Sequence, residues 1–101
     1  MNNKLDQSDF FCVHCGKRGI PVWRKKGKAR EDGHLKKLYC IYCGKETNHA
    51  ECKIGTPYSY DDFKIEFEYG NFTEDGLRIY TLKQLKSMIR EGKIEKVKEL
   101  T

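Results

Sequence analysis

The motif Cys-x-x-Cys-Gly-Lys occurs twice in this chain, at residues 12–17 and 40–45, with 24 residues between the inner cysteines. Two sulfurs three positions apart can face one ion only if the backbone turns tightly between them. A glycine after the second cysteine favours such a turn, because backbone amides can approach the sulfurs with no Cβ in the way. Four thiolates at about 2.3 Å in a tetrahedron form a closed structural zinc site. The repeated motif therefore predicts one structural Zn²⁺, bound by Cys12, Cys15, Cys40 and Cys43.

Other chemistries compete for the five cysteines of the chain. A disulfide framework is typical of small secreted domains, but the count is odd and no export signal is visible before the first motif. Iron held by four thiolates is the main competing metal, and such a site would transfer electrons and be coloured. A catalytic zinc would need an open coordination position, which four cysteines close. Structural zinc is therefore the preferred interpretation.

His49 and Cys52 follow the second motif and stand three positions apart. They could replace one cysteine ligand or supply a second metal site. In an extended strand, however, residues three apart point to opposite faces, which disfavours joint ligation. We therefore expect Cys52 to be a small buried side chain and His49 to be exposed or at the edge of the core.

Residues 10–54 resemble the zinc ribbon superfamily, through two Cys-x-x-Cys-Gly-Lys knuckles separated by a basic, strand-rich stretch. The resemblance implies two β-hairpins that grip one metal ion. It also implies binding of nucleic acid or protein, and no catalysis by the zinc itself. The chain is more loosely similar to small phage or mobile-element zinc-ribbon proteins.

Strand signals flank the stretch between the two motifs. Residues 20–24 and 35–42 are rich in β-branched and aromatic side chains, and we expect them to pair as a hairpin. Residues 25–33 contain two glycines and no large apolar residue, so they should form an exposed tip. A third strand is expected at 45–54. Because so short a ribbon cannot build a sufficient hydrophobic core, removal of the metal should unfold it.

Positive charge is concentrated within the predicted ribbon. The net charge of the chain is +5, but residues 17–37 hold nine Lys and Arg against two acidic residues, a net of +7, whereas residues 51–80 have a net of −4. A clustered positive field favours phosphate-bearing partners. Trp23 could stack on a base, or could cover the ribbon core together with Val22 and Tyr39. The predicted nucleic-acid-binding residues are Lys17, Arg18, Trp23, Arg24, Lys25, Lys26, Lys28, Arg30, Lys36 and Lys37.

The segment 58–101 is predicted to be a mostly helical C-terminal extension, which makes the fold class α+β. Ser59 can cap a helix that ends at Gly70, although residues 63–69 also alternate in the manner of a half-buried strand; we favour the helix. A capping box at 81–84 predicts a second helix, whose Leu82, Leu85 and Ile89 we expect to pack against Phe63 and Phe67.

The acidic and aromatic stretch after residue 57 supports an alternative function. In this alternative, the protein is a regulator that docks on a larger nucleic-acid-processing protein, such as a polymerase or nuclease, through Phe63, Phe67 and Phe72.

We expect no enzyme activity and no small-molecule substrate. The chain carries no serine nucleophile motif and no Gly-rich phosphate loop, and acidic residues such as Glu66 and Glu68 are expected to be solvated. The longest apolar run, residues 38–43, is far below the roughly 20 residues that a membrane span needs. We therefore predict a cytoplasmic protein with no membrane partner.

Overall fold

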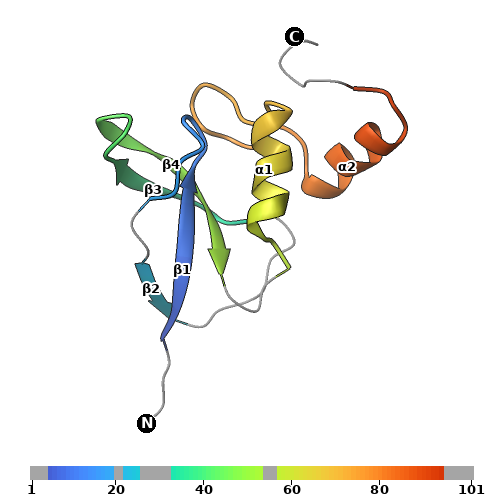
Figure 1. The fold of residues 1–101 in the computed structure, drawn as a ribbon. Coiled ribbons are helices and arrows are strands. Elements are labelled where there is room, and N and C mark those ends of the chain that lie inside the picture. The colour runs from blue at the N-terminus through green and yellow to red at the C-terminus, as the bar shows by residue number, and fades with distance from the viewer. Residues whose placement is uncertain (1–4, 20–21, 26–32, 54–56, 95–101) are drawn as a thin grey trace.

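A computed structural model describes residues 5–19, 22–25, 33–53 and 57–94. Four strands come first: β1 (Leu5–Cys12), β2 (Val22–Lys25), β3 (Leu35–Cys40) and β4 (Lys45–Lys53). Two helices follow, α1 (Tyr60–Glu68) and α2 (Leu82–Arg90). The predicted α+β class is confirmed (Figure 1). Most of the predicted tip at 25–33 lies outside the described residues.

The strands form one antiparallel sheet in the order β2-β1-β4-β3. Strands β1 and β4 occupy the centre, with Cys12 opposite His49, and β3 continues the sheet with Cys40 opposite Lys45. The predicted hairpin between residues 20–24 and 35–42 is wrong, because β2 and β3 lie at opposite edges of the sheet. The missing partner is β1, a strand that the sequence analysis did not assign and that separates β2 from β4.

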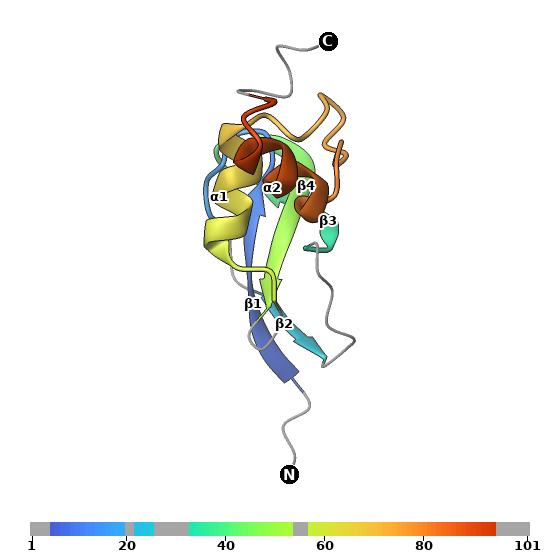
Figure 2. The ribbon, with the colours of Figure 1, turned by 90° about the vertical axis from the view of Figure 1, so that its right-hand side faces the viewer.

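One face of the sheet is covered by α1 (Figures 1 and 2). Successive residues of a strand point to opposite faces, so a single face collects every second side chain of β1 and β4. The core between helix and sheet therefore combines residues of the sheet region with residues of the C-terminal segment that follows position 57. Its buried members are Phe11, Val13, Ala50, Tyr58, Phe63, Phe72 and Leu82.

Capping explains why residues 60–68 are a helix. The side chain of Ser59 accepts a hydrogen bond from the backbone N–H of Asp62, and the Asp62 carboxylate accepts one from the backbone N–H of Ser59. Gly70 then ends the segment with a φ of 70°, a conformation that costs glycine little. The helix interpretation is confirmed, and the strand alternative is wrong.

The second helix carries the predicted capping box at Thr81 and Gln84. Its packing differs in part from the expectation: Leu82 joins the Phe63 cluster, but Leu85 packs in a separate cluster that includes Ile65. Because Ile65 lies on a different side of α1 from Phe63, α2 contacts the flank of α1. Neither helix of the described ranges has the length and apolar character that crossing a bilayer requires.

A buried polar network ties α1 to the rest of the fold. Glu66 is 0% exposed, which corrects the expectation that it is solvated. Its carboxylate accepts hydrogen bonds from the Tyr58 hydroxyl at 2.5 Å, from Arg78 Nε at 2.6 Å and from Asn71 Nδ2 at 2.9 Å. Arg78 also donates from a second nitrogen to the carbonyl of Gly33 at 2.8 Å. The network thus links α1, the loop before α2 and Gly33, which lies two residues before the start of β3.

The network predicts a large difference between two similar substitutions on α1. Glu66→Gln should lower the free energy of unfolding by about 3–5 kcal/mol, because Arg78 would keep a buried charge with no counter-ion. Glu68→Gln, at an exposed position two residues away, should change it by no more than about 0.5 kcal/mol. Urea unfolding of the metal-loaded proteins measures both values. Equal values for the two variants would show that the buried pair contributes nothing specific.

Candidate metal centre

The four cysteines of the two motifs meet at one end of the sheet. All their sulfur atoms lie within 4.8 Å of one another. Between the two knuckles, Cys12 Sγ lies 3.8 Å from Cys43 Sγ, and Cys15 Sγ lies 3.7 Å from Cys40 Sγ. Tetrahedral bonds of about 2.3 Å place sulfurs about 3.8 Å apart, whereas a disulfide needs about 2.05 Å. The four cysteines therefore form a group that can hold one metal ion, as the motifs predicted.

The sheet topology explains how two distant motifs come together. Strands β1 and β3 both run antiparallel to β4, one on each side of it, so they run in the same direction and end at the same end of the sheet. Each ends at the first cysteine of a motif, Cys12 or Cys40. The second cysteines, Cys15 and Cys43, lie in the tight turns that follow.

Both turns have the same backbone geometry. The amide of Gly16 donates to the Cys12 carbonyl and that of Gly44 to the Cys40 carbonyl, each at 2.8 Å. The glycines have φ angles of 76° and 71°, in the left-handed region. The glycine of each motif thus serves mainly to adopt this conformation, which L-residues with a Cβ disfavour. The backbone hydrogen bond to sulfur comes from one position earlier, from the Cys43 amide to Cys40 Sγ at 3.4 Å.

Polar groups around the sulfurs support the thiolate form unevenly. Burial opposes ionisation of the Cys40 thiol, but hydrogen bonds from the amides of Cys43 and Tyr42 outweigh it and lower the pKa to about 7. Burial and the neighbouring thiols raise the pKa of Cys43 to about 12. The buried Thr47 hydroxyl lies 3.1 Å from Cys12 Sγ and can donate to a thiolate there. Four anionic sulfurs at this spacing repel one another, so full ionisation requires a bound cation.

The two knuckles have different surroundings although their backbones match. In the first, Val13 is 5% exposed and belongs to the core beneath α1. A Cβ added at Gly16 would lie only 2.8 Å from the Phe67 ring, whereas one at Gly44 would have no atom within 4 Å. In the second, Ile41 is 63% exposed and Tyr42 58%. The helix therefore covers the first knuckle and leaves the second open.

His49 and Cys52 do not belong to the metal-binding group found among the described residues. His49 is fully buried, so the expectation of an exposed or edge position is wrong. Its Nδ1 lies 2.9 Å from the carbonyl oxygen of Thr47, burial lowers its pKa, and its Nε2 has no hydrogen-bond partner among the described residues. Cys52 packs against the core under α1 but is only partly buried, whereas a buried side chain was expected; burial raises its pKa to about 12.

The described residues of the predicted nucleic-acid surface do not gather at one edge of the sheet: Arg18 bridges Phe11 on the side of β1 that faces β2, whereas β3 forms the opposite edge. Lys17 is exposed, and its Nζ lies 4.8 Å from the centroid of the Tyr42 ring. Arg18 forms an exposed ion pair with Asp9 at 2.8 Å, a kind of pair that contributes little stability. Lys36 and Lys37 lie on β3, and Lys37 is exposed.

The remaining predicted contacts lie on β2 or outside the described residues. Trp23, Arg24 and Lys25 belong to β2, at the edge opposite β3. Lys26, Lys28 and Arg30 lie outside the described residues. Tyr39 is 60% exposed and does not cover the ribbon core, contrary to one interpretation of Trp23 and its neighbours.

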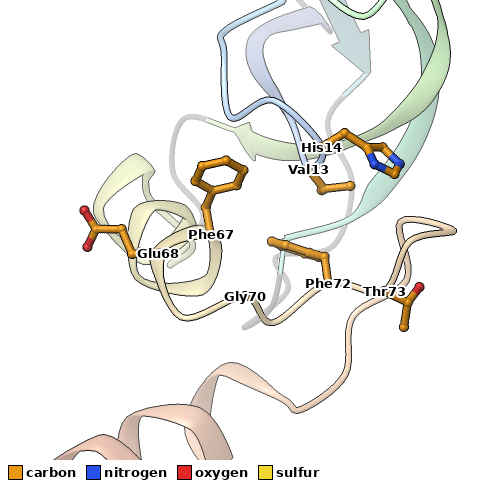
Figure 3. A pocket seen from close by; sticks show the side chains of 7 residues that line it. All are labelled: Val13, His14, Phe67, Glu68, Gly70, Phe72 and Thr73. Atoms are coloured by element: carbon orange, nitrogen blue, oxygen red, sulfur yellow. The ribbon is translucent and has the colours of Figure 1, made fainter. Parts of the chain in front are cut away.

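The aromatic residues of the alternative protein-binding function are mostly interior. Phe63 and Phe72 are fully buried in the core under α1 and present no surface to a partner. Phe67 is half-buried, beside a hollow of about 270 Å³ between the first knuckle and the end of α1. Figure 3 shows Phe67, Phe72 and Val13 around this hollow, with Glu68 pointing away. Phe63, Phe67 and Phe72 thus serve mainly to pack the core under α1.

No protein-family model, no curated protein and no solved structure matches this chain.

Substitution of the two motif glycines should distinguish the energetic cost of backbone strain from the cost of a steric clash with α1. Alanine at either position costs about 1–2 kcal/mol for the left-handed backbone. Gly16→Ala should cost about 1–3 kcal/mol more than Gly44→Ala, because its methyl group would press on the Phe67 ring. Urea unfolding of the metal-loaded proteins gives both values. A smaller cost at Gly16 than at Gly44 would contradict the docking of the first knuckle on α1.

The metal-binding group predicts a contrast between two cysteine substitutions. Wild-type protein should bind one divalent ion per chain, and Cys40→Ser should lose it or hold it far more weakly. Cys52→Ser should bind as the wild type does, because Cys52 lies outside the group. Native mass spectrometry with and without a chelator counts the ions. Equal metal content in the two variants would rule out the four-cysteine site.

Proposed function

We propose that this protein is a zinc-stabilised nucleic-acid-binding module of the zinc-ribbon type. Zinc is the metal that a closed tetrahedral set of four thiolates most often holds as a structural ion. Bound by Cys12, Cys15, Cys40 and Cys43, it would neutralise the thiolates and hold the ends of β1 and β3 together. The sulfur separations of 3.7 and 3.8 Å between the knuckles fit such an ion.

The free thiols of the chain suit a reducing compartment. All five cysteines are unbridged, and two pairs of sulfurs lie close enough for oxidation to compete with metal binding. We therefore place the action of the protein in the cytoplasm, where thiols stay reduced.

The segregation of charge is the observation that carries the nucleic-acid proposal. Residues 17–37 have a net charge of +7. Two carboxylates of the acidic part of the chain are paired within it, because Asp62 pairs with Lys86 at 2.8 Å and Glu66 with Arg78 at 2.6 Å. The ribbon thus keeps most of the positive field of the molecule, with Lys17 and Lys37 exposed beside the metal-binding end.

This field suits the phosphate backbone of a nucleic acid. Lysine and arginine contacts to phosphates release counterions, so binding of this kind weakens steeply with salt. In this proposal the ribbon supplies a fixed, metal-held scaffold, and the cations of β3, the first knuckle and the stretch 24–30 contact the backbone. The protein acts by binding and carries out no chemistry on its partner.

Removal of two lysines from the ribbon should weaken nucleic-acid binding and its salt dependence together. For Lys17→Gln combined with Lys37→Gln, the plot of the logarithm of the binding constant against the logarithm of the salt concentration should become less steep. Its slope should decrease in magnitude by about 0.7 for each phosphate that is no longer neutralised on a single strand, or about 0.9 on a duplex. Lys64→Gln combined with Lys83→Gln removes the same charge from the exposed faces of α1 and α2 and should leave the slope unchanged. Fluorescence anisotropy with labelled oligonucleotides at several salt concentrations measures both.

A second variant tests the rest of the basic stretch, with three substitutions made together: Arg24→Gln, Lys25→Gln and Lys26→Gln. It should also reduce the slope. If both ribbon variants bind like the helix control, the ribbon is not the contact surface and the proposal is wrong.

A further inference from the structure

The second knuckle exposes large hydrophobic side chains that no other part of the described structure covers. Among the described residues, six large hydrophobic side chains are exposed, and three of them are Tyr39, Ile41 and Tyr42. Ile41 and Tyr42 stand between two metal-binding cysteines, so the turn that closes the metal site holds them in place. Rigid, exposed aromatic and aliphatic groups at one tip mark an interaction surface.

Comparison with the first knuckle shows that the exposure of Ile41 is not a property of the motif, because the equivalent Val13 is buried, whereas His14 and Tyr42 are both exposed. The two turns share their backbone hydrogen bonds and their positive-φ glycines. The first turn is nonetheless docked on α1, with Val13 in the core and Gly16 against Phe67. The second turn has a matching shape and no covering element, since nothing lies within 4 Å of a Cβ placed at Gly44.

The charge around the second knuckle selects the kind of partner. Residues 33–45 contain Lys36, Lys37 and Lys45 and no acidic residue. Lys17 adds a fourth ammonium group, held 4.8 Å from the centroid of the Tyr42 ring. Aromatic side chains interleaved with cations fit a strand whose bases stack and whose phosphates are bound. An apolar protein surface would gain nothing from this concentration of positive charge.

The shape of the surface distinguishes single strands from duplexes. Within a duplex, the faces of the bases are covered by their neighbours, and only base edges are open in the grooves. A stacking side chain therefore needs unpaired bases that can be splayed onto it. The second knuckle is the tip of the β3–β4 hairpin, and its exposed Tyr42 offers a ring face of this kind.

We propose that the second knuckle is a base-stacking site for single-stranded nucleic acid, with Ile41 and Tyr42 against the bases and Lys17 and Lys45 on the adjoining phosphates. The inference rests on the proposed function and defines its substrate class. It assigns separate contributions to the two kinds of side chain: the lysines set the salt dependence, and the knuckle tip sets the preference for unpaired bases.

The test uses a fluorescein-labelled oligothymidylate of about a dozen nucleotides, together with a duplex of the same length. Wild-type protein should bind the single strand more tightly than the duplex. Ile41→Ser combined with Tyr42→Ser should lower the single-strand affinity about 5- to 150-fold. The salt slope should stay the same because no charge is removed. Tyr42→Phe keeps the ring and should keep the affinity within about twofold.

Leu77→Ser is the matched surface control, because Leu77 is also exposed but lies in the loop before α2. It should bind the oligonucleotide as the wild type does. Native mass spectrometry of each variant, with one metal ion retained, shows that the knuckle still folds.

The outcomes separate the two proposals. If the lysine variants of the ribbon lose affinity but the Ile41 and Tyr42 double variant does not, the stacking site is wrong and nucleic-acid binding stands. Equal binding of duplex and single strand, equally lowered by the double substitution, also overturns the stacking site. If the wild type binds neither probe, both proposals fall.

Discussion

The mutual repulsion of four sulfurs is the constraint on which the rest of this fold depends. At a separation of about 3.8 Å, each pair of thiolates repels by about 4 kcal/mol at an effective dielectric constant of 20. The cysteines can therefore be ionised together only around a cation, and a divalent ion at about 2.3 Å from each sulfur reverses the sign of the local energy. Strands β1 and β3 are not bonded to each other, because β4 lies between them. A metal ion bound by the four cysteines would connect their ends directly.

A second connection acts on the other end of β3. Cys40 closes this edge strand at the metal-binding end, and the carbonyl of Gly33, two residues before its start, accepts a hydrogen bond from Arg78. Arg78 is in turn held by the buried carboxylate of Glu66. An edge strand bonded on one side only is thus fixed at both of its ends. The lysines of β3 therefore lie on a backbone that is already ordered before binding. This order reduces the conformational entropy that is lost on association.

The sequence predicted the features that depend on local chemistry and missed those that depend on distant partners. The cysteine motifs, the Ser59 cap and the capping box at 81–84 each act within a few residues, so their patterns could be recognised directly. The pairing of β2 with β1 could not, because the half of β1 that pairs with β2 is mostly polar and the partners of β1 lie far along the chain. Glu66 stands in an alternating, charged segment, and its burial depends on Arg78, Tyr58 and Asn71, which no spacing rule connects. The buried position of His49 likewise follows from its place in a central strand.

The two knuckles show how a fold can give one motif two different uses. The second residue between the cysteines, His14 or Tyr42, is exposed in both copies, but the first differs: Val13 is buried and Ile41 is open. The difference arises from α1, which crosses the sheet on the side of the first knuckle and packs Phe67 against Gly16. Docking of the first copy gives the small sheet an apolar core that a bound metal ion alone would not provide. The second copy does not pack against the helix, so the side chains between its cysteines remain accessible to a partner.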